Sequence, residues 1–140
     1  MRLDADDCWE RLGSWGHGAL GTVHPVRGVD AVPVVFVVQD GRIVLPIDTV
    51  KAKSGRRLQR LVNLEADDRC MLLVDHYDQD WSRLWWVRVH GRASEADPTS
   101  EQLGLLGQSF AAYRAPGSVT GAVVLNPDEV NGWTAEPVAT

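Results

Sequence analysis

One short stretch of the sequence concentrates positive charge in a way that suits chemistry on an anionic ligand. The segment from Asp48 to Leu64, DTVKAKSGRRLQRLVNL, holds both lysines of the chain, and five of the 14 basic residues fall at positions 51–60. The whole chain carries 19 acidic residues and a net charge of −5. A compact cationic patch on an acidic body favours a small anion over a nucleic acid, because nucleic acids need an extended positive surface.

The same stretch predicts a loop between a strand ending at Asp48 and a helix capped by Ser54. The apolar residues of that helix recur at a period near 3.6: Leu58, Leu61 and Val62. The loop would place Lys51 and Lys53 beside a helix N-terminus, whose unpaired N–H groups attract phosphate or carboxylate. Basic residues are unfavourable at a helix N-terminus unless an anion offsets them. We therefore expect an anion site here, with a merely solvated charged surface as the alternative.

Three of the six tryptophans form a second unusual group: Trp81, Trp85 and Trp86. Adjacent residues on a strand face opposite sides of the sheet, so Trp85 and Trp86 cannot both fill one core. One would pack inside the fold while the other covers a planar ligand or a partner subunit, where large aromatic side chains are favoured. A sheet that packs both tryptophans as ordinary core residues is the alternative, and the sequence leaves both open.

Other common kinds of active site lack their sequence patterns. The four histidines have no metal-ligand spacing, so we expect no metal site and interpret them as structural or surface residues. The two cysteines, Cys8 and Cys70, are too far apart in sequence to suggest a disulfide framework and are expected to be core thiols. No serine lies in a GxSxG context, which argues against a serine hydrolase.

The elements that must position these residues are short strands with few helices. We predict a helix capped by Asp4, a hairpin turn at Asp40–Gly41, and a second helix over 99–113. Strands are predicted at 19–24, 29–38, 42–48, 71–76, 84–92 and 121–127. About six strands in meander order, with helices only in some gaps, favour a small antiparallel barrel over a doubly wound sheet.

Length and composition limit the number of domains and the cellular location that we expect. At 140 residues we expect one domain spanning 1–140. No run of 18 apolar residues is present, and the segment MRLDADDCWE opens with acids rather than with a signal sequence. We therefore expect a cytoplasmic protein with no membrane and no nucleic-acid partner.

The order of several segments resembles one known family. These are VPVVFVV, DGRIVLPID, KSGRRLQRLVNL, LLVDHYDQDW and RLWWVRVHGRA, and together they run from about Leu20 to Ala93. They are similar to the split β-barrel flavin and deazaflavin proteins related to pyridoxamine 5′-phosphate oxidase, and most of all to the actinobacterial branch that uses the deazaflavin coenzyme F420. The resemblance implies a mainly β fold, a six-stranded antiparallel split β-barrel.

It also implies a homodimer with the cofactor in a cleft at the subunit interface. The cofactor phosphate would be held by Lys51, Lys53 and Arg57. The ring system would lie against the second and third strands, near Pro33, Val34, Val35, Ile47, Asp48 and Thr49. Either subunit could supply Trp85 or Trp86 to the site.

The activity implied by the resemblance is hydride transfer between the deazaflavin and a small electron-poor organic acceptor. FMN is the alternative cofactor. If a proton donor is needed, the candidates are His76 and Tyr77, which follow the fourth strand. Two further interpretations stay open: a non-catalytic protein that binds or carries the deazaflavin, FMN or a related tetrapyrrole, and a dimeric structural protein without a ligand.

Overall fold

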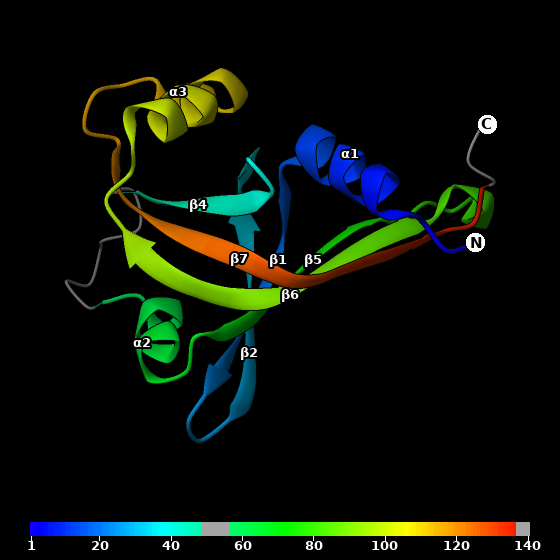
Figure 1. The fold of residues 1–140 in the computed structure, drawn as a ribbon, viewed down its shortest axis with the longest axis horizontal. Coiled ribbons are helices and arrows are strands. Elements are labelled where there is room, and N and C mark those ends of the chain that lie inside the picture. The colour runs from blue at the N-terminus through cyan, green and yellow to red at the C-terminus, as the bar shows by residue number, and fades with distance from the viewer. Residues whose placement is uncertain (49–56, 137–140) are drawn as a thin grey trace.

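The computed structural model describes residues 1–48 and 57–136, and one curved antiparallel sheet organises them (Figure 1). Its strands are β1 (His17–His24), β2 (Gly28–Val35), β3 (Val37–Gln39), β4 (Arg42–Asp48), β5 (Arg69–His76), β6 (Trp85–Ala96) and β7 (Val119–Thr134). The helices are α1 (Ala5–Trp15), α2 (Gln59–Ala66) and α3 (Ser100–Ser109), with two 3₁₀ turns, η1 (Trp81–Arg83) and η2 (Ala111–Tyr113). None of these helices is long and apolar enough to cross a membrane.

Helix α1 forms where its capping residues predict. The Asp4 side chain accepts a hydrogen bond from the N–H of Asp7, and the helix ends at Gly16, whose φ of 79° favours glycine. Cys8 and Leu12 are fully buried on the face that meets the sheet. The predicted Asp4 cap is confirmed, because a cap depends on contacts within one turn of the helix.

The Asp40–Gly41 pair makes the predicted hairpin between β3 and β4. Both residues have positive φ, 49° and 73°, as a two-residue turn of this twist requires. Val37 pairs with Val44 and Gln39 with Arg42, which confirms the antiparallel arrangement. The earlier hairpin, β1 with β2, also forms as a continuous ladder from His17–Val35 to His24–Gly28.

A single buried residue closes the sheet into a barrel. The strand order is β2-β1-β5-β6-β7-β4-β3, so β2 and β3 lie at opposite edges although only Phe36 separates them in the chain. The sheet must therefore curl until its two edges meet at Phe36. The Phe36 side chain is fully buried and its N–H donates to the carbonyl of Gly16 at 2.9 Å.

The prediction of one strand over 29–38 is wrong, because this segment forms two strands, β2 and β3. Its first part pairs with β1 and its last part with β4, so the described residues form seven strands rather than six. A continuous β-branched run cannot show such a change of partner, because every residue in it has the same strand preference.

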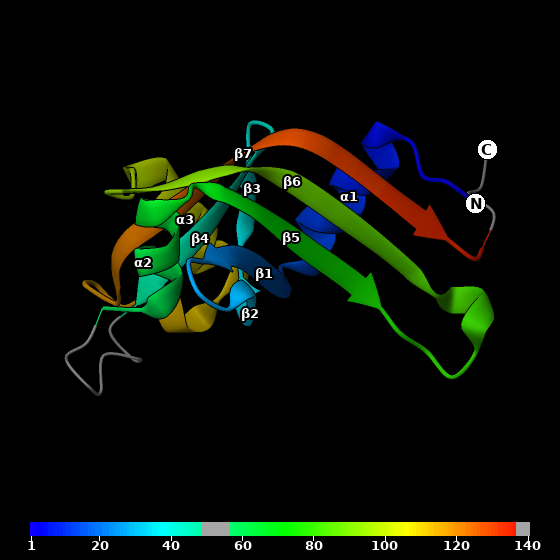
Figure 2. The ribbon, with the colours of Figure 1, turned by 90° about the horizontal axis from the view of Figure 1, so that it is seen from below.

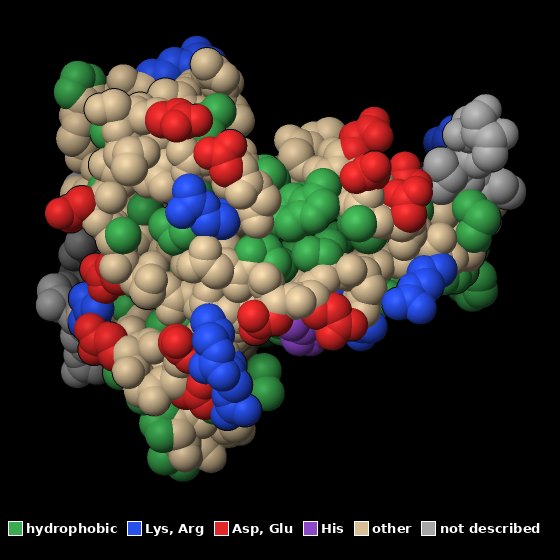
Figure 3. Space-filling view, in the orientation of Figure 1, with side chains coloured by type: hydrophobic (Ala, Val, Ile, Leu, Met, Phe, Trp, Pro, Cys, Tyr) green, Lys and Arg blue, Asp and Glu red, His purple; other side chains and the backbone are tan. Residues whose placement is uncertain are grey.

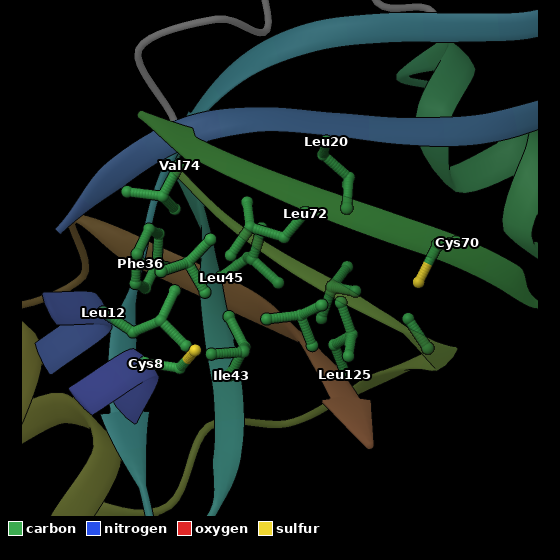
Figure 4. Packing of buried hydrophobic residues seen from close by; sticks show 14 of the residues in the cluster. Cys8, Leu12, Leu20, Phe36, Ile43, Leu45, Cys70, Leu72, Val74 and Leu125 are labelled. Atoms are coloured by element: carbon green, nitrogen blue, oxygen red, sulfur yellow. The ribbon is translucent and has the colours of Figure 1, made fainter. Parts of the chain in front are cut away.

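The barrel interior holds the main hydrophobic core (Figure 4). Leu20, Leu72 and Leu125 come from three different strands and are almost wholly buried. Cys8 and Leu12 of α1 close one side against Ile43. Both cysteines are free and buried, as expected for core thiols. Burial raises the pKa of the Cys70 thiol to about 12, so this sulfur stays protonated.

The two later helices differ from the predicted ones at their ends. Helix α2 begins at Gln59 with Leu58 as its N-cap, so the prediction of Ser54 as the cap is wrong, and Ser54 itself lies outside the described residues. Leu58 has a non-helical backbone, with φ −58° and ψ 135°, and its side chain packs against the core. Helix α3 ends at Ser109 rather than at 113, because Phe110 is extended and η2 follows it.

Strands β5, β6 and β7 continue beyond the barrel as a long arm (Figure 2). The predicted strand over 121–127 runs from 119 to 134, since β7 pairs with β4 in its first half and with β6 along most of its length. The ladder shifts register between His90 and Gly91. Helix α1 packs on one face of the arm, and the chain's N-terminus lies near its far end.

Candidate functional site

The candidate site is a cleft where β2 faces β4 across the seam of the barrel. The two strands are not paired with each other, so their side chains form opposing walls. The lining includes five residues predicted from the sequence: Pro33, Val34, Val35, Ile47 and Asp48. These residues are brought together only by the closure at Phe36. Thr49, predicted to lie beside them, is outside the described residues.

One end of the cleft is polar and is formed by Tyr113 and Asp48. The Tyr113 hydroxyl donates a 2.7 Å hydrogen bond to Oδ2 of Asp48. Burial, followed by this bond to a carboxylate, raises the pKa of Tyr113 to about 12. The phenol therefore keeps its proton at neutral pH and acts there as a hydrogen-bond donor.

Arg60, in the first turn of α2, supplies the positive charge of the cleft. Its side chain is half-buried, and burial lowers the pKa of the guanidinium, while Asp48 and Tyr113 oppose that shift. An arginine stays charged despite such a shift. Helix α2 has no side-chain hydrogen bond at its N-cap, so the partial positive charge of this helix end adds to that of Arg60.

Of the predicted phosphate-binding residues, only Arg57 is among the described ones. Its guanidinium makes ion pairs of 2.6 Å with Glu65 and 2.5 Å with Glu95, and it does not line the cleft. These carboxylates raise the pKa of Arg57. A phosphate would have to compete with both acids for this side chain. Lys51 and Lys53 lie outside the described residues.

Trp85 and Trp86 lie at the other end of β6 from the cleft. Ala96 ends β6 beside Ala122, and Ala122 also pairs with Pro46 of the cleft. Trp85 is 11 residues from Ala96, roughly 36 Å along an extended strand. The β2 wall is nearer, because Val35 pairs with His17, whose ring stacks on Trp15 beside Trp85, but neither Trp85 nor Trp86 lines the cleft.

The two tryptophans face opposite sides of the arm, as predicted from their adjacency. Trp85 is buried, with Trp15 edge-on at 5.0 Å and the guanidinium of Arg11 5.1 Å from its ring centre. Trp86 is only half-buried on the outer face, and the Arg88 guanidinium lies 4.4 Å over its ring.

The candidate proton donors, His76 and Tyr77, also lie on the arm. His76 pairs with Trp85 at the end of β5, contacts the Trp15 ring, and has Nε2 at 3.6 Å from Asp78. Tyr77 is 70% exposed. Neither residue lines the cleft.

Sequence reasoning missed the two residues that most define the polar end of the cleft. Arg60 was counted in the basic stretch but not assigned a role, although its position in the first turn of the helix was a usable signal. Tyr113 had no local signal, because it reaches Asp48 from 65 residues away. Across residues 1–48 and 57–136, no group of three or more His, Cys, Asp or Glu side chains is arranged to hold a metal ion.

Several solved structures share this fold along nearly their whole length. A FAD-binding protein from Mesorhizobium loti is 17% identical with a TM-score of 0.70, and the match covers 94% of this chain and 95% of that one. The FAD binding protein of Mycobacterium smegmatis is 23% identical with a TM-score of 0.64, covering 95% and 96%. A conserved hypothetical protein of Mycobacterium tuberculosis is 22% identical with a TM-score of 0.71, covering 99% and 91%.

These likenesses confirm the predicted fold class, a mainly β, antiparallel split barrel. No curated protein matches the chain. The family profile described as pyridoxamine 5′-phosphate oxidase matches residues 4–132, which is most of the sequence. On this match and the shared barrel, the chain belongs to the pyridoxamine 5′-phosphate oxidase family.

Proposed function

We propose that this protein is an oxidoreductase that binds a deazaflavin, coenzyme F420, and transfers hydride between it and a small electron-poor organic acceptor. The observation that carries the proposal is the cleft between β2 and β4. It joins apolar walls to a polar end that holds the half-buried Arg60 and the Tyr113–Asp48 pair. FMN is the alternative cofactor, and the two neighbours described as FAD-binding proteins make FAD a third to test.

The residues of the cleft fit such a cofactor by their chemistry. Pro33, Val34 and Val35 offer an apolar surface to a flat ring system, which favours burial of its faces. Arg60 and the uncapped N-terminus of α2 would hold an anionic group of the cofactor. Asp48 would repel an anion, but the hydrogen bond from Tyr113 partly offsets its charge.

The cleft of one subunit is too small to enclose a ring system. It holds only about 30 Å³, close to the volume share of a single water molecule. The ring would therefore lie in the mouth of the cleft and need cover from outside. A second copy of the chain is the proposed cover, which makes the homodimer part of this proposal.

The outer face of the arm offers a surface for that second copy. Trp86 and Trp133 are cross-strand neighbours there, and Trp133 is 38% exposed. Aromatic and arginine side chains such as these, with Arg88 beside them, are enriched at subunit interfaces. Sedimentation of the purified protein would test this: a dimer is expected, and a monomer that binds the cofactor with full affinity would contradict it.

The deazaflavin would supply the hydride, so the protein need not provide a nucleophile or a metal. The apolar walls would exclude water from the reacting face and fix its distance to the acceptor. Tyr113 would hold its proton and orient Asp48 rather than exchange the proton with the acceptor, since its pKa is raised to about 12.

The same cleft also suits a protein that only binds or carries the cofactor. The observation that favours this second candidate is that Tyr113 is held protonated, and that neither His76 nor Tyr77 lies at the cleft of its own subunit. Turnover separates the two functions. A carrier would bind the reduced cofactor tightly and oxidise it with none of a panel of quinones, enones and bilins.

The deciding experiment is a titration with the deazaflavin, FMN and FAD, each followed by tryptophan and cofactor fluorescence. We expect micromolar or tighter binding of the deazaflavin and weaker binding of the other two. Preference for FMN or FAD would overturn the choice of cofactor but would leave the cleft as the proposed binding site. Binding of none of the three would overturn the cofactor proposal itself.

A further inference from the structure

A hollow separate from the cleft lies between α3 and the segment that leads from η2 into β7. Its walls are Leu103, Gly104 and Gly107 of α3 and residues 113–119, and it holds about 330 Å³, within the range of small-molecule sites. Figure 3 shows hydrophobic side chains and a basic group at the surface around α3. No step of the proposed hydride transfer uses this hollow.

Arg114 is the only charged side chain among the described residues that line the hollow. Its Nε donates a 2.8 Å hydrogen bond to the carbonyl of Gly107. This bond offsets part of the negative charge at the carboxyl end of α3 and fixes the direction of the guanidinium. Within residues 1–48 and 57–136, the two terminal amino groups of Arg114 make no hydrogen bond or ion pair. These amino groups are therefore available to a ligand.

The terminal amino groups of Arg114 suit a carboxylate, because its two oxygens can accept hydrogen bonds from both at once. The acids of the neighbouring elements lie outside the hollow. Asp48 accepts the hydrogen bond from Tyr113, but it lines the cleft, and Glu101 in the first turn of α3 lines neither. The charge at the described walls of the hollow is therefore positive and comes from one arginine.

The rest of the hollow is largely apolar. Leu103, Pro116 and Val119 line it together with Tyr113, whose hydroxyl is already bonded to Asp48. The Leu103 side chain is 40% exposed, so a ligand in the hollow would cover apolar surface that now faces water. The α3 wall also includes two glycines, which leave space beside the helix.

We propose that this hollow binds a small organic carboxylate, an acid group carried on a compact apolar body. The carboxylate would accept hydrogen bonds from the terminal amino groups of Arg114, and the apolar body would cover Leu103. A neutral analogue would lose the charge-assisted hydrogen bonds, and a cation would be repelled by Arg114. This site is distinct from the proposed cofactor cleft, and its occupation requires no cofactor.

The test compares three probes of nearly equal shape: benzoate, the neutral benzamide and the cationic benzamidinium. The chain has two tyrosines, so tyrosine-labelled protein gives two sets of ring signals by NMR, assigned with the Tyr77→Phe variant. Tyr113 lines the hollow, whereas the exposed Tyr77 lies on the arm and serves as the internal control.

Benzoate should shift the Tyr113 signals, leave the Tyr77 signals in place, and bind at least about tenfold more tightly than benzamide. Benzamidinium should bind least. Equal binding of benzoate and benzamide, or no shift of Tyr113 with any probe, would overturn the proposal. The titration contains no cofactor, so its outcome is independent of whether the cleft binds a deazaflavin.

A pair of arginine variants tests the role of charge. Arg114→Gln should weaken benzoate binding at least about tenfold and leave benzamide binding nearly unchanged. The matched control is Arg83→Gln, which changes the net charge equally but lies in η1 on the arm. Equal losses of benzoate affinity in the two variants would show that net charge matters rather than Arg114.

A pair of glycine variants tests the location of binding. A Cβ at Gly104 or at Gly13 would meet nothing within 4 Å, so a side chain fits at either position. Gly104 lines this hollow, whereas Gly13 lines a different one between α1, β3 and α3. Gly104→Leu should weaken benzoate binding at least about tenfold by occupying the space, and Gly13→Leu should leave it unchanged. Equal effects would show that benzoate binds elsewhere.

Discussion

Tyr113 and Asp48 are joined by a 2.7 Å hydrogen bond, although 65 residues separate them in the chain. The bond ties η2, which follows α3, to the end of β4 at the polar end of the cleft. Because this hydrogen bond forms only in the folded protein, we expect it to contribute to the free energy of unfolding. We also expect that contribution to change with pH, since Tyr113 can ionise.

The first prediction concerns the alkaline range. The pKa of Tyr113 is about 12 in the folded chain and near 10 when unfolded, so the protonated phenol stabilises the fold. That contribution is complete below pH 10 and is lost as the pH rises towards 12. Tyr113→Phe should lower the free energy of unfolding at neutral pH by about 1 kcal/mol, because the hydrogen bond is gone. The variant should also no longer lose stability between pH 10 and pH 12. Urea unfolding at several pH values measures both effects.

A direct check uses the second tyrosine of the chain. In a Tyr77→Phe background Tyr113 is the sole tyrosine, so phenolate absorbance reports it alone. An ionisation midpoint near pH 10 in that variant would contradict the assignment.

The second prediction separates the two arginines nearest the basic stretch. Arg60→Gln should weaken deazaflavin binding at least tenfold, about 1.4 kcal/mol, because Arg60 is the half-buried cation of the cleft. Arg57→Gln should weaken it less, because Arg57 is exposed and already engaged by Glu65 and Glu95. Fluorescence titration of each variant gives the affinities. A larger loss in Arg57→Gln would show that Arg57 leaves its acidic partners to bind the cofactor.

For the basic residues at positions 51–60, the prediction that they hold the cofactor phosphate is tested separately. The double variant Lys53→Ala, Arg57→Ala is expected to fold normally and lose at least tenfold in cofactor affinity. Comparison with Arg57→Gln would assign the loss to Lys53 or to Arg57. An unchanged affinity in the double variant would remove both from the site.

The third prediction concerns the attachment of α2 to the barrel. Asn63 is fully buried, and its amide donates to Thr22 Oγ1 and to Asp30 Oδ2, each at 3.0 Å. Asn63→Ala should lower the free energy of unfolding by about 1–3 kcal/mol, since the buried Thr22 hydroxyl and the partly exposed Asp30 carboxylate each lose a hydrogen bond. The matched control is Asn126→Ala on the exposed side of β7, where a change within about 0.5 kcal/mol is expected. Equal changes in chemical denaturation would contradict the role of Asn63.

The fourth prediction concerns the bulge in the β6–β7 ladder. A Cβ at Gly91 would lie 2.2 Å from the carbonyl oxygen of Asn126, which is a steric clash. Gly91→Ala should therefore cost about 3 kcal/mol, because the backbone of β7 would have to move. Gly104→Ala, in the open part of α3, should instead stabilise by about 0.5–1 kcal/mol. Thermal unfolding of the two variants should shift the midpoint in opposite directions.

Features that depend on neighbours in the chain could be predicted well. The Asp4 cap of α1 and the Asp40–Gly41 turn both follow from hydrogen bonds and dihedral angles within a few residues. The walls of the cleft were also predicted, through the resemblance to a family rather than from periodicity. The start of α2 was missed, because the period of Leu58, Leu61 and Val62 does not show that the backbone of Leu58 is non-helical.

The sequence by itself therefore determined most of the strands, the Asp4 cap of α1 and the Asp40–Gly41 turn, and its resemblance indicated the family. Only the tertiary structure decided that Phe36 marks a change of partner, that Tyr113 reaches Asp48, and that Arg57 turns to two glutamates. It also placed Trp85 in contact with Trp15 and outside the lining of the cleft. The reason is that local preferences act over a few residues, whereas these contacts exist only after the sheet curls and brings distant edges together.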